Sequence, residues 1–193
     1  KGIVKKTNLS EYRNFRKGGI IGMNIDEGDE ICNVQLTHGD AEVVLITQAG
    51  MSIRFHESDL RDQGRATRGV KGVTLKKQDD CVKNMLIVNP DETLLIVGKN
   101  GQGKRTLFEE YRRQSRGGSG VIAIKTSGVA GALSVDENDE VIIVTQKGQA
   151  VRSPVKDIRI IGRTTQGVRC INLAQNDQVV GVSKIVEVED TEA

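Results

Sequence analysis

Short apolar runs alternate with glycine turns along this chain, and the same order recurs four times. In three of the repeats, an apolar run leads into a glycine that is followed four positions later by an arginine; the runs are Val43–Thr47, Leu94–Val97 and Val141–Thr145. The turn glycines are Gly2, Gly50, Gly101 and Gly148, with spacings of 48, 51 and 47 residues. A second set follows at Gly19, Gly69, Gly120 and Gly167, with spacings of 50, 51 and 47 residues. Two markers that keep one period indicate an internal repeat.

Each repeat predicts about four short β-strands. In the second repeat the β-rich segments are Val43–Thr47, Met51–Phe55, Gly69–Leu75 and Val82–Val88, separated by Gly, Asn and Asp turns. Four strands in a unit of roughly fifty residues are typical of a propeller blade. The absence of Trp disfavours the WD40 version of that fold. We therefore predict an all-β, propeller-like domain over residues 1–186, with repeats at approximately 1–40, 41–91, 92–138 and 139–186.

The two ends of the chain depart from this pattern. The first repeat lacks the apolar run that precedes the turn glycine elsewhere, so Gly2 enters the pattern in the middle of a blade. We expect an incomplete first blade and a chain that is part of a longer protein. Residues 187–193 form an acidic tail, which we expect to fray or to continue into an acidic extension.

The composition is that of a folded protein, with 37% hydrophobic and 28% charged residues. Cys32, Cys81 and Cys170 are widely spaced and form no zinc-binding pattern, so we expect reduced thiols in a cytoplasmic protein with no metal and no cofactor. His38 and His56 lack the partners of a catalytic triad, and we expect no catalytic residues. No apolar run has the length of a membrane span, and we expect neither membrane insertion nor export.

The charges are distributed unevenly although the net charge is only +2. The four glycine-to-glycine halves (residues 2–25, 50–75, 101–125 and 148–173) hold 21 of the 28 Lys and Arg residues but only 7 of the 26 acidic residues. These halves therefore carry a net charge of +14, against −12 for the remainder. Because they recur once per blade, a propeller would arrange them as a basic band, which is the electrostatic footprint of a nucleic-acid-binding protein.

Within the basic halves, two cation positions recur most strictly. Lys6, Arg54, Arg105 and Arg152 lie four residues after the turn glycines, while Arg16, Arg65, Arg116 and Arg163 lie three or four before the second glycines. The other predicted DNA-binding residues are Lys5, Arg68, Lys71, Lys104 and Arg169. Phosphate contact is one interpretation, since a regular array of cations suits a regular array of anions. The other is that the arginines connect neighbouring blades through acidic partners.

Two further patterns bear on nucleotide and nucleic-acid binding. Residues 98–105 nearly match a phosphate-binding loop, but Arg105 replaces the required Ser or Thr and the stretch aligns with strand-to-strand turns, so we predict no nucleotide site. The few aromatic residues do not interleave with the basic ones as a base-stacking platform requires. We expect Phe55 and Phe108 to pack in the core, and duplex DNA to be a better ligand than single strands.

Several motifs resemble those of a known family. Residues 100–106 (NGQGKRT), 115–121 (SRGGSGV), 162–168 (GRTTQGV) and 2–7 (GIVKKT) are similar to blade motifs in the C-terminal domain of bacterial DNA gyrase A. The similarity covers essentially the whole chain. It implies a β-pinwheel, in which blades exchange strands with their neighbours, and a basic rim that bends and wraps double-stranded DNA without sequence preference.

The resemblance also implies a place in a larger enzyme. The chain would be a non-catalytic part of an ATP-dependent type II topoisomerase that supercoils DNA at the bacterial nucleoid, with the rest of gyrase A and with gyrase B as partners. The family's Gln-Arg-Arg-Gly-Gly-x-Gly box would lie in an earlier blade, with residues 114–120 a degenerate copy, so we expect bending without the complete wrap. The C-terminal domain of topoisomerase IV and a propeller that binds other proteins remain alternatives.

Overall fold

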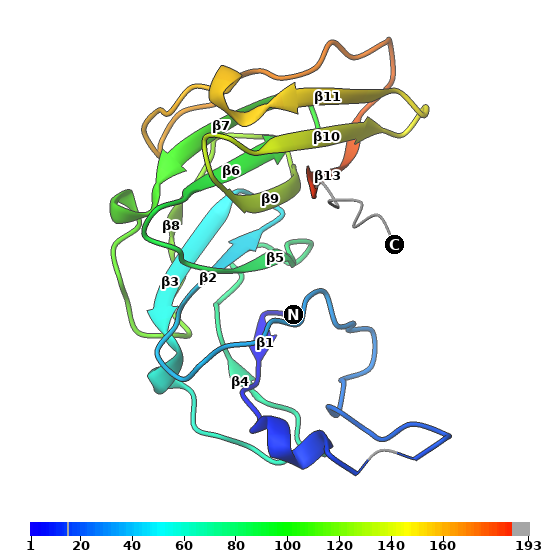
Figure 1. The fold of residues 1–193 in the computed structure, drawn as a ribbon, viewed down its shortest axis with the longest axis vertical. Helices are drawn as coiled ribbons and strands as arrows, with labels where there is room; N and C mark the ends of the chain where they lie inside the picture. Colours follow the sequence, from blue (N-terminus) through cyan, green and yellow to red (C-terminus); the bar gives the residue numbers. More distant parts are fainter. Residues whose placement is uncertain (15, 187–193) are drawn as a thin grey trace, which may run out of the picture. The chain divides into compact units, whose positions relative to one another are not determined.

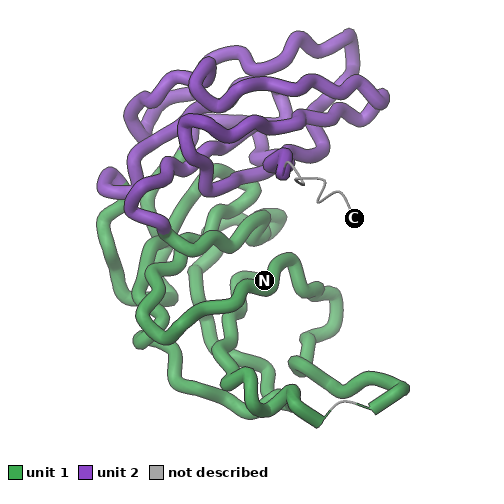
Figure 2. Tube along the Cα trace, in the orientation of Figure 1, with its two compact units in different colours: residues 1–88, 111–123 green, residues 89–110, 124–193 purple. Residues whose placement is uncertain are grey.

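The described part of the chain, residues 1–14 and 16–186 of a computed structural model, is built of β-strands and short 3-10 helices (Figure 1). The predicted acidic tail at 187–193 lies outside the described residues. The chain contacts divide into two compact units, one of residues 1–88 and 111–123, the other of residues 89–110 and 124–193 (Figure 2). The chain thus leaves the first unit, returns to it and leaves again.

The strands follow the predicted repeat. In the first unit they are β1 (Ile3–Val4), β2 (Glu42–Thr47), β3 (Met51–His56), β4 (Val70–Lys71), β5 (Val82–Ile87) and β8 (Val121–Ile122). In the second unit they are β6 (Thr93–Gly98), β7 (Gln102–Leu107), β9 (Val129–Val135), β10 (Glu140–Thr145), β11 (Ala150–Pro154), β12 (Val168–Arg169) and β13 (Val179–Ile185). The 3-10 helices are η1 (Leu9–Tyr12), η2 (Glu57–Asp59), η3 (Phe108–Glu110) and η4 (Val155–Asp157).

Three strands form the body of the second, third and fourth repeats. A hairpin joins the first two strands, and the last strand returns antiparallel to the first, which gives the orders β5-β2-β3, β9-β6-β7 and β13-β10-β11. Gly50, Gly101 and Gly148 make the hairpin turns with φ of 83°, 78° and 86°, values that suit glycine. The recurring apolar run and turn glycine are therefore one structural unit, as the sequence predicts.

The remaining short strand of each repeat is added to the preceding repeat. β4 pairs with β1, β8 with β3, and β12 with β7, all antiparallel and over two residues each. The strand expected at Gly69–Leu75 is therefore shorter than predicted and spans only Val70–Lys71. It pairs with β1 over these two residues, after which the chain turns away. This exchange between successive repeats gives the β-pinwheel architecture.

The second glycines recur because the exchanged strands approach their neighbours closely. A Cβ added to Gly69, Gly120 or Gly167 would lie 2.6 Å or closer to a backbone carbonyl oxygen of the preceding repeat, a distance real Cβ atoms essentially never show. The three carbonyls belong to Val4, Ser52 and Gly103, each two residues after a turn glycine. Only glycine fits at these positions. The first glycine of each repeat therefore marks the hairpin turn, and the second marks the junction with the preceding repeat.

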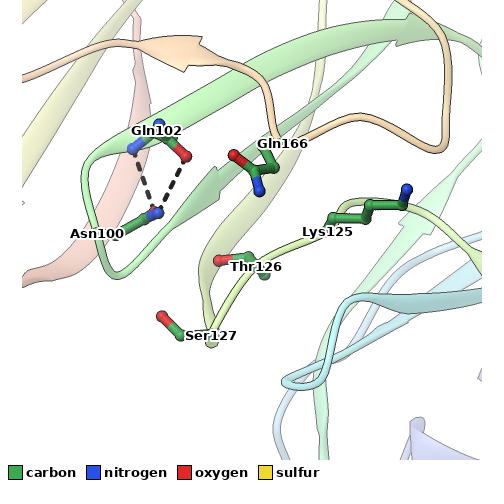
Figure 3. A pocket seen from close by; sticks show the side chains of 6 residues that line it. All are labelled: Asn100, Gln102, Lys125, Thr126, Ser127 and Gln166. Carbon is green, nitrogen blue, oxygen red and sulfur yellow. Dashed lines mark hydrogen bonds between the residues drawn. The ribbon is translucent and has the colours of Figure 1, made fainter.

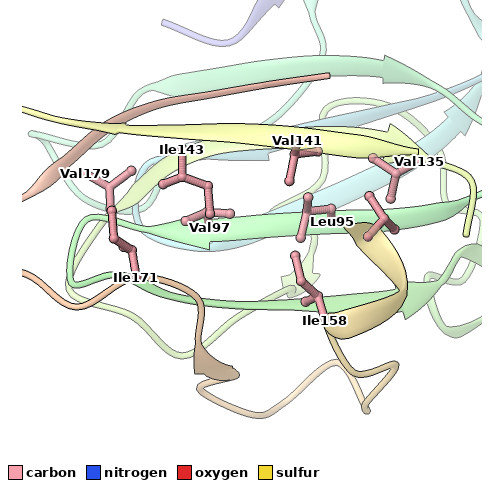
Figure 4. Packing of buried hydrophobic residues seen from close by; sticks show 9 residues of the cluster. Leu95, Val97, Val135, Val141, Ile143, Ile158, Ile171 and Val179 are labelled. Carbon is pink, nitrogen blue, oxygen red and sulfur yellow. The ribbon is translucent and has the colours of Figure 1, made fainter. Parts of the chain in front are cut away.

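Each unit has its own apolar core. In the second unit, buried side chains of β6 such as Leu95 and Val97 pack with Val141 and Ile143 of β10, in a cluster that Figure 4 shows between the two strands. The first unit buries Val43, Leu45, Ile53, Phe55, Leu60 and Val73. The predicted core positions of Phe55 and Phe108 are confirmed, with exposed fractions of 0% and 1%.

The first repeat lacks more than the apolar run before Gly2, because the strands expected after Gly19 are not formed either. Its residues 13–41 contain no strand among those described, whereas the corresponding segments of the other repeats form β5, β9 and β13. Ile31, Val34 and Leu36 are consequently exposed, by 52%, 77% and 75%. Only β1, paired with β4, represents the described part of this repeat in a sheet.

Candidate nucleic-acid interface

The cations four residues after the turn glycines mostly connect successive repeats. The contacts are an ion pair between Lys6 Nζ and Asp62 Oδ1 (3.2 Å), and hydrogen bonds from Arg54 Nη1 to the Tyr111 carbonyl (3.4 Å) and from Arg105 Nε to the Ile158 carbonyl (2.7 Å). Arg54 also pairs with Glu42 of its own hairpin. Arg105 is only 4% exposed. This geometry is the one expected of connections between blades.

Arg152 holds the same position in the fourth repeat but lies at the surface. It forms an ion pair with Glu140 across its own hairpin, and its side chain is 57% exposed. Exposed pairs of this kind contribute little to folding stability. Of the four cations at this position, Arg152 is therefore the one that a large external ligand can reach most easily.

Three of the four arginines before the second glycines, Arg65, Arg116 and Arg163, also reach the preceding repeat. Their side chains are half-buried and donate to main-chain carbonyls: Arg65 Nη1 to Ile21 (3.0 Å), Arg116 Nε to Asp59 (3.0 Å), Arg116 Nη1 to Lys71 (3.1 Å) and Arg163 Nε to Glu110 (3.1 Å). Asp59 and Glu110 each end the 3-10 helix of their repeat. Equivalent donors thus find equivalent acceptors at successive junctions.

Lys5 and Lys104, three residues after turn glycines, point inward. Lys104 is fully buried, and its Nζ donates to the carbonyls of Gly162 and Arg163 and to Thr165 Oγ1. Burial lowers the pKa of Lys104 to about 8, with Glu110 opposing this change and Arg163 adding to it. Burial and the nearby Arg65 likewise lower the pKa of Lys5.

The other predicted cations are exposed, namely Arg16, Arg68, Lys71 and Arg169. Arg68 makes two hydrogen bonds to the Asp26 carboxylate, both of 2.6 Å, which together with its charge lower the pKa of Asp26. Arg169 Nη1 donates to Asn172 Oδ1 at 3.3 Å. Lys71 and Arg169 both lie two residues after a second glycine, whereas Arg16 and Arg68 lie before one, and each of the four remains a candidate contact.

One row of exposed arginines keeps the period but is not among the predicted contacts. The residue eleven positions after each turn glycine is an arginine, and all four are exposed: Arg13, Arg61, Arg112 and Arg159. We call this set the arginine ladder. Within residues 1–14 and 16–186, none of the four forms an ion pair or side-chain hydrogen bond. Aligning the repeats on their turn glycines would have revealed it.

The backbone that carries the ladder arginines is held by local structure and by hydrogen bonds. Each directly follows a 3-10 helix or its C-cap residue, and in three repeats the residue before the arginine is buried, at Leu60, Tyr111 and Ile158. Just beyond the ladder, the N–H groups of Gln63, Gln114 and Ile161 donate to the carbonyls of Lys6, Arg54 and Arg105. In the second unit, the Arg105 N–H also donates to the Arg159 carbonyl at 3.1 Å. These connections between repeats therefore position Arg61, Arg112 and Arg159.

The stretch that resembles a phosphate-binding loop is a hairpin turn. Residues 99–101 join β6 to β7, so no helix N-terminus follows Gly101. Asn100 and Gln102 line a shallow polar pocket with Lys125, Thr126, Ser127 and Gln166 (Figure 3). Asn100 Nδ2 donates to Gln102 Oε1 at 3.1 Å, and the Gln102 backbone N–H donates to Asn100 Oδ1 at 3.3 Å. The absence of a phosphate-binding loop follows from this topology.

Other kinds of site find no support in the described residues. No group of three or more His, Cys, Asp and Glu side chains there could hold a metal ion. The three cysteines are unpaired thiols, and burial raises the pKa of Cys170 to about 11. None of the described helices is long and apolar enough to cross a membrane.

The chain is similar in sequence to gyrase proteins of several bacteria. It is 40% identical over 190 residues to DNA gyrase A of Chlamydia pneumoniae and 42% identical over 195 residues to DNA gyrase A of Salmonella typhimurium. These alignments cover 96% and 99% of this chain but only 23% and 22% of the two relatives. The chain thus spans less than a quarter of the length of the relatives it matches.

Two solved structures share the fold. The C-terminal domain of DNA topoisomerase IV superposes with a TM-score of 0.89 at 28% identity, covering 95% of this chain and 59% of that one. The DNA gyrase A C-terminal domain gives 0.84 at 28% identity, covering 96% and 63%. The family model described as "DNA gyrase C-terminal domain, beta-propeller" matches residues 1–37, 41–89, 92–136 and 139–185. The chain therefore belongs to the family of DNA gyrase C-terminal β-propeller domains.

Proposed function

We propose that this chain binds and bends double-stranded DNA without sequence preference, and that the arginine ladder makes its principal phosphate contacts. The observation that carries the proposal is the exposure of Arg13, Arg61, Arg112 and Arg159 at one position of each repeat. A guanidinium group can donate two parallel hydrogen bonds to a phosphate. Phosphate contacts are independent of base sequence, and cations that recur with the repeat suit a regularly charged duplex.

The surroundings of the ladder support the same ligand. The glycine-to-glycine halves that contain it carry a net charge of +14, while the rest of the chain carries −12. Exposed Arg16, Lys71 and Arg169 lie in the same halves and are further candidate contacts. A concentration of positive charge attracts DNA over a Debye length and orients it before contact.

At the level of the whole protein, we propose that the chain serves a type II topoisomerase of the gyrase class. Its relatives at 40–42% identity are DNA gyrase A proteins, which favours that role over one in topoisomerase IV. The cleavage site, the rest of gyrase A and its partner gyrase B would then lie outside these residues, and the assembly would act on DNA in the bacterial cytoplasm.

A binding experiment with single charge changes tests the proposal. Fluorescence anisotropy with a labelled duplex is measured over a series of salt concentrations for the wild type, Arg112→Gln and Lys77→Gln. Lys77 is an exposed cation outside the basic halves and serves as the control. We expect Arg112→Gln to make the log–log salt slope shallower by about 1 and Lys77→Gln to leave it unchanged. Equal effects of both changes, or binding restricted to one DNA sequence, would contradict the proposal.

A further inference from the structure

Lys104 is fully buried, and its ammonium group is enclosed by acceptors from the next repeat. Its Nζ lies 2.7 Å from the Gly162 carbonyl oxygen, 2.5 Å from that of Arg163 and 3.3 Å from Thr165 Oγ1. The Thr165 hydroxyl in turn donates to the Gly162 carbonyl at 2.8 Å. One lysine therefore donates to three acceptors of a single loop, including the Arg163 carbonyl.

A related arrangement occurs at an earlier junction. Lys5 Nζ donates to the carbonyls of Gly64 (3.3 Å) and Arg65 (2.5 Å), and its third acceptor is the Gly22 carbonyl (2.5 Å) in place of the threonine hydroxyl. Thr67 donates to the Gly64 carbonyl at 2.8 Å, as Thr165 does to that of Gly162. At two junctions, the lysine three residues after the turn glycine therefore donates to the same two loop carbonyls.

The junction between the second and third repeats is built differently. The position of Lys5 and Lys104 is taken by Ile53, and the threonine of the loop is replaced by Gly118. A Cβ on Gly118 would lie 3.6 Å from Ile53 Cδ1, so the isoleucine fills the space that the lysine and threonine occupy elsewhere. Lysine at the first position is thus found with threonine in the loop, and isoleucine with glycine. We therefore expect the two positions to be replaceable only together.

The loop whose carbonyls accept from the lysine connects a ladder arginine to the second glycine of the repeat. In the fourth repeat it begins just after Arg159 of the ladder and ends at Gly167, the glycine of the exchanged strand. Between them, the Arg163 N–H donates to Glu110 Oε2 at 2.9 Å and Arg163 Nε to the Glu110 carbonyl. A displacement of this loop would therefore move the backbone that carries Arg159.

We propose that Lys104 and Lys5 are positioning residues for DNA binding, which fix the arginine-bearing loop of the following repeat without contacting DNA themselves. This inference rests on the proposed function. The charged groups facing Lys104 are Glu110 and Arg163, and the one facing Lys5 is Arg65. Each ammonium group donates to three oxygens of the protein and has no donor left for a phosphate.

The experiment compares Lys104→Met with a graft of the other junction. The graft combines Lys104→Ile with Thr164→Gly and Thr165→Gly, which gives the residues found at Ile53, Gly117 and Gly118. Duplex affinity per folded molecule and its salt dependence are measured by anisotropy, and amide hydrogen exchange is measured over residues 161–167. We expect Lys104→Met to weaken binding about fivefold without changing the salt slope, and to speed exchange in the loop. The graft should restore affinity to within about twofold of the wild type.

Several outcomes would overturn the inference. A salt slope shallower by about 1 in Lys104→Met that the graft does not restore would indicate a direct phosphate contact. If the wild type binds the duplex and Lys104→Met binds it with the same affinity, the inference is overturned and the proposed function is not. A wild type that does not bind duplex DNA would overturn the proposed function, and the inference with it. Should Lys104→Met not fold, Lys5→Met gives the same comparison in the other compact unit.

Discussion

Arg105 carries its charge inside the protein. Its side chain is 4% exposed and donates to the Ile158 carbonyl at 2.7 Å. Replacement by Met should leave that carbonyl without its donor and lower the free energy of unfolding by about 1–3 kcal/mol in urea denaturation. The matched change Arg152→Met, in an exposed pair, should cost less than about 1 kcal/mol. Equal stabilities of the two variants would show that the contact at Arg105 contributes nothing.

The buried ammonium of Lys104 should make stability depend on pH. Its pKa of about 8 lies below the ordinary lysine value of 10.5, so between these values the unfolded chain binds more protons. The contribution of Lys104 to the free energy of unfolding should therefore rise from pH 8 to pH 10.5. The difference between wild type and Lys104→Met, followed by urea denaturation across this range, isolates that contribution. A difference that is constant with pH would mean that the folded-state pKa of Lys104 is not lowered.

At the residue scale, the sequence could not separate cations that bind a ligand from cations that hold the fold. Arg105 and Arg112 both keep the period of the repeat, yet one is buried and the other exposed. Periodicity shows that the same residue type recurs in every blade, but the direction of its side chain depends on the neighbouring repeat. For this reason the sequence predicted Arg105 as a DNA contact and did not predict Arg112.

Strand exchange is the feature that most constrains the individual elements. At Gly120, with φ of 70°, a Cβ would collide with the Ser52 carbonyl of the neighbouring repeat. Gly120→Ala should therefore displace β8 from β3 and lower the free energy of unfolding by about 2–4 kcal/mol. Gly18→Ala is the control, because no atom lies within 4 Å and its φ is not positive. A Gly120→Ala variant as stable as the control would contradict the pairing of β8 with β3.

At the element scale, the hairpins were predictable and the exchanged strands were not. Apolar runs before Gly50, Gly101 and Gly148 identify β2, β6 and β10 to within one or two residues. The exchanged strands have two residues each, too few for an alternating pattern, and their partners lie in another repeat. Only the resemblance to a known family indicated that exchange.

The whole chain should bend the DNA that it binds. Curving a site of 20–30 base pairs by 40–90° costs about 1–6 kcal/mol, so contacts from successive repeats must offset that cost. A duplex labelled at both ends should therefore show increased energy transfer on binding, and the increase should be smaller for Arg61→Gln/Arg112→Gln at saturating protein. Binding with no change in transfer would indicate a straight duplex and contradict this expectation.

We infer that the arginine ladder, and not the buried connections between repeats, binds phosphate. The most direct test is the salt dependence of duplex affinity for the variant Arg13→Gln/Arg61→Gln/Arg112→Gln/Arg159→Gln. With roughly six phosphates neutralised, the wild type should give a log–log slope of about −5, and loss of four contacts should bring it to about −1.5. The variant should unfold at the same urea concentration as the wild type, because the four side chains are exposed. A slope that stays near −5 in the folded variant would contradict this inference.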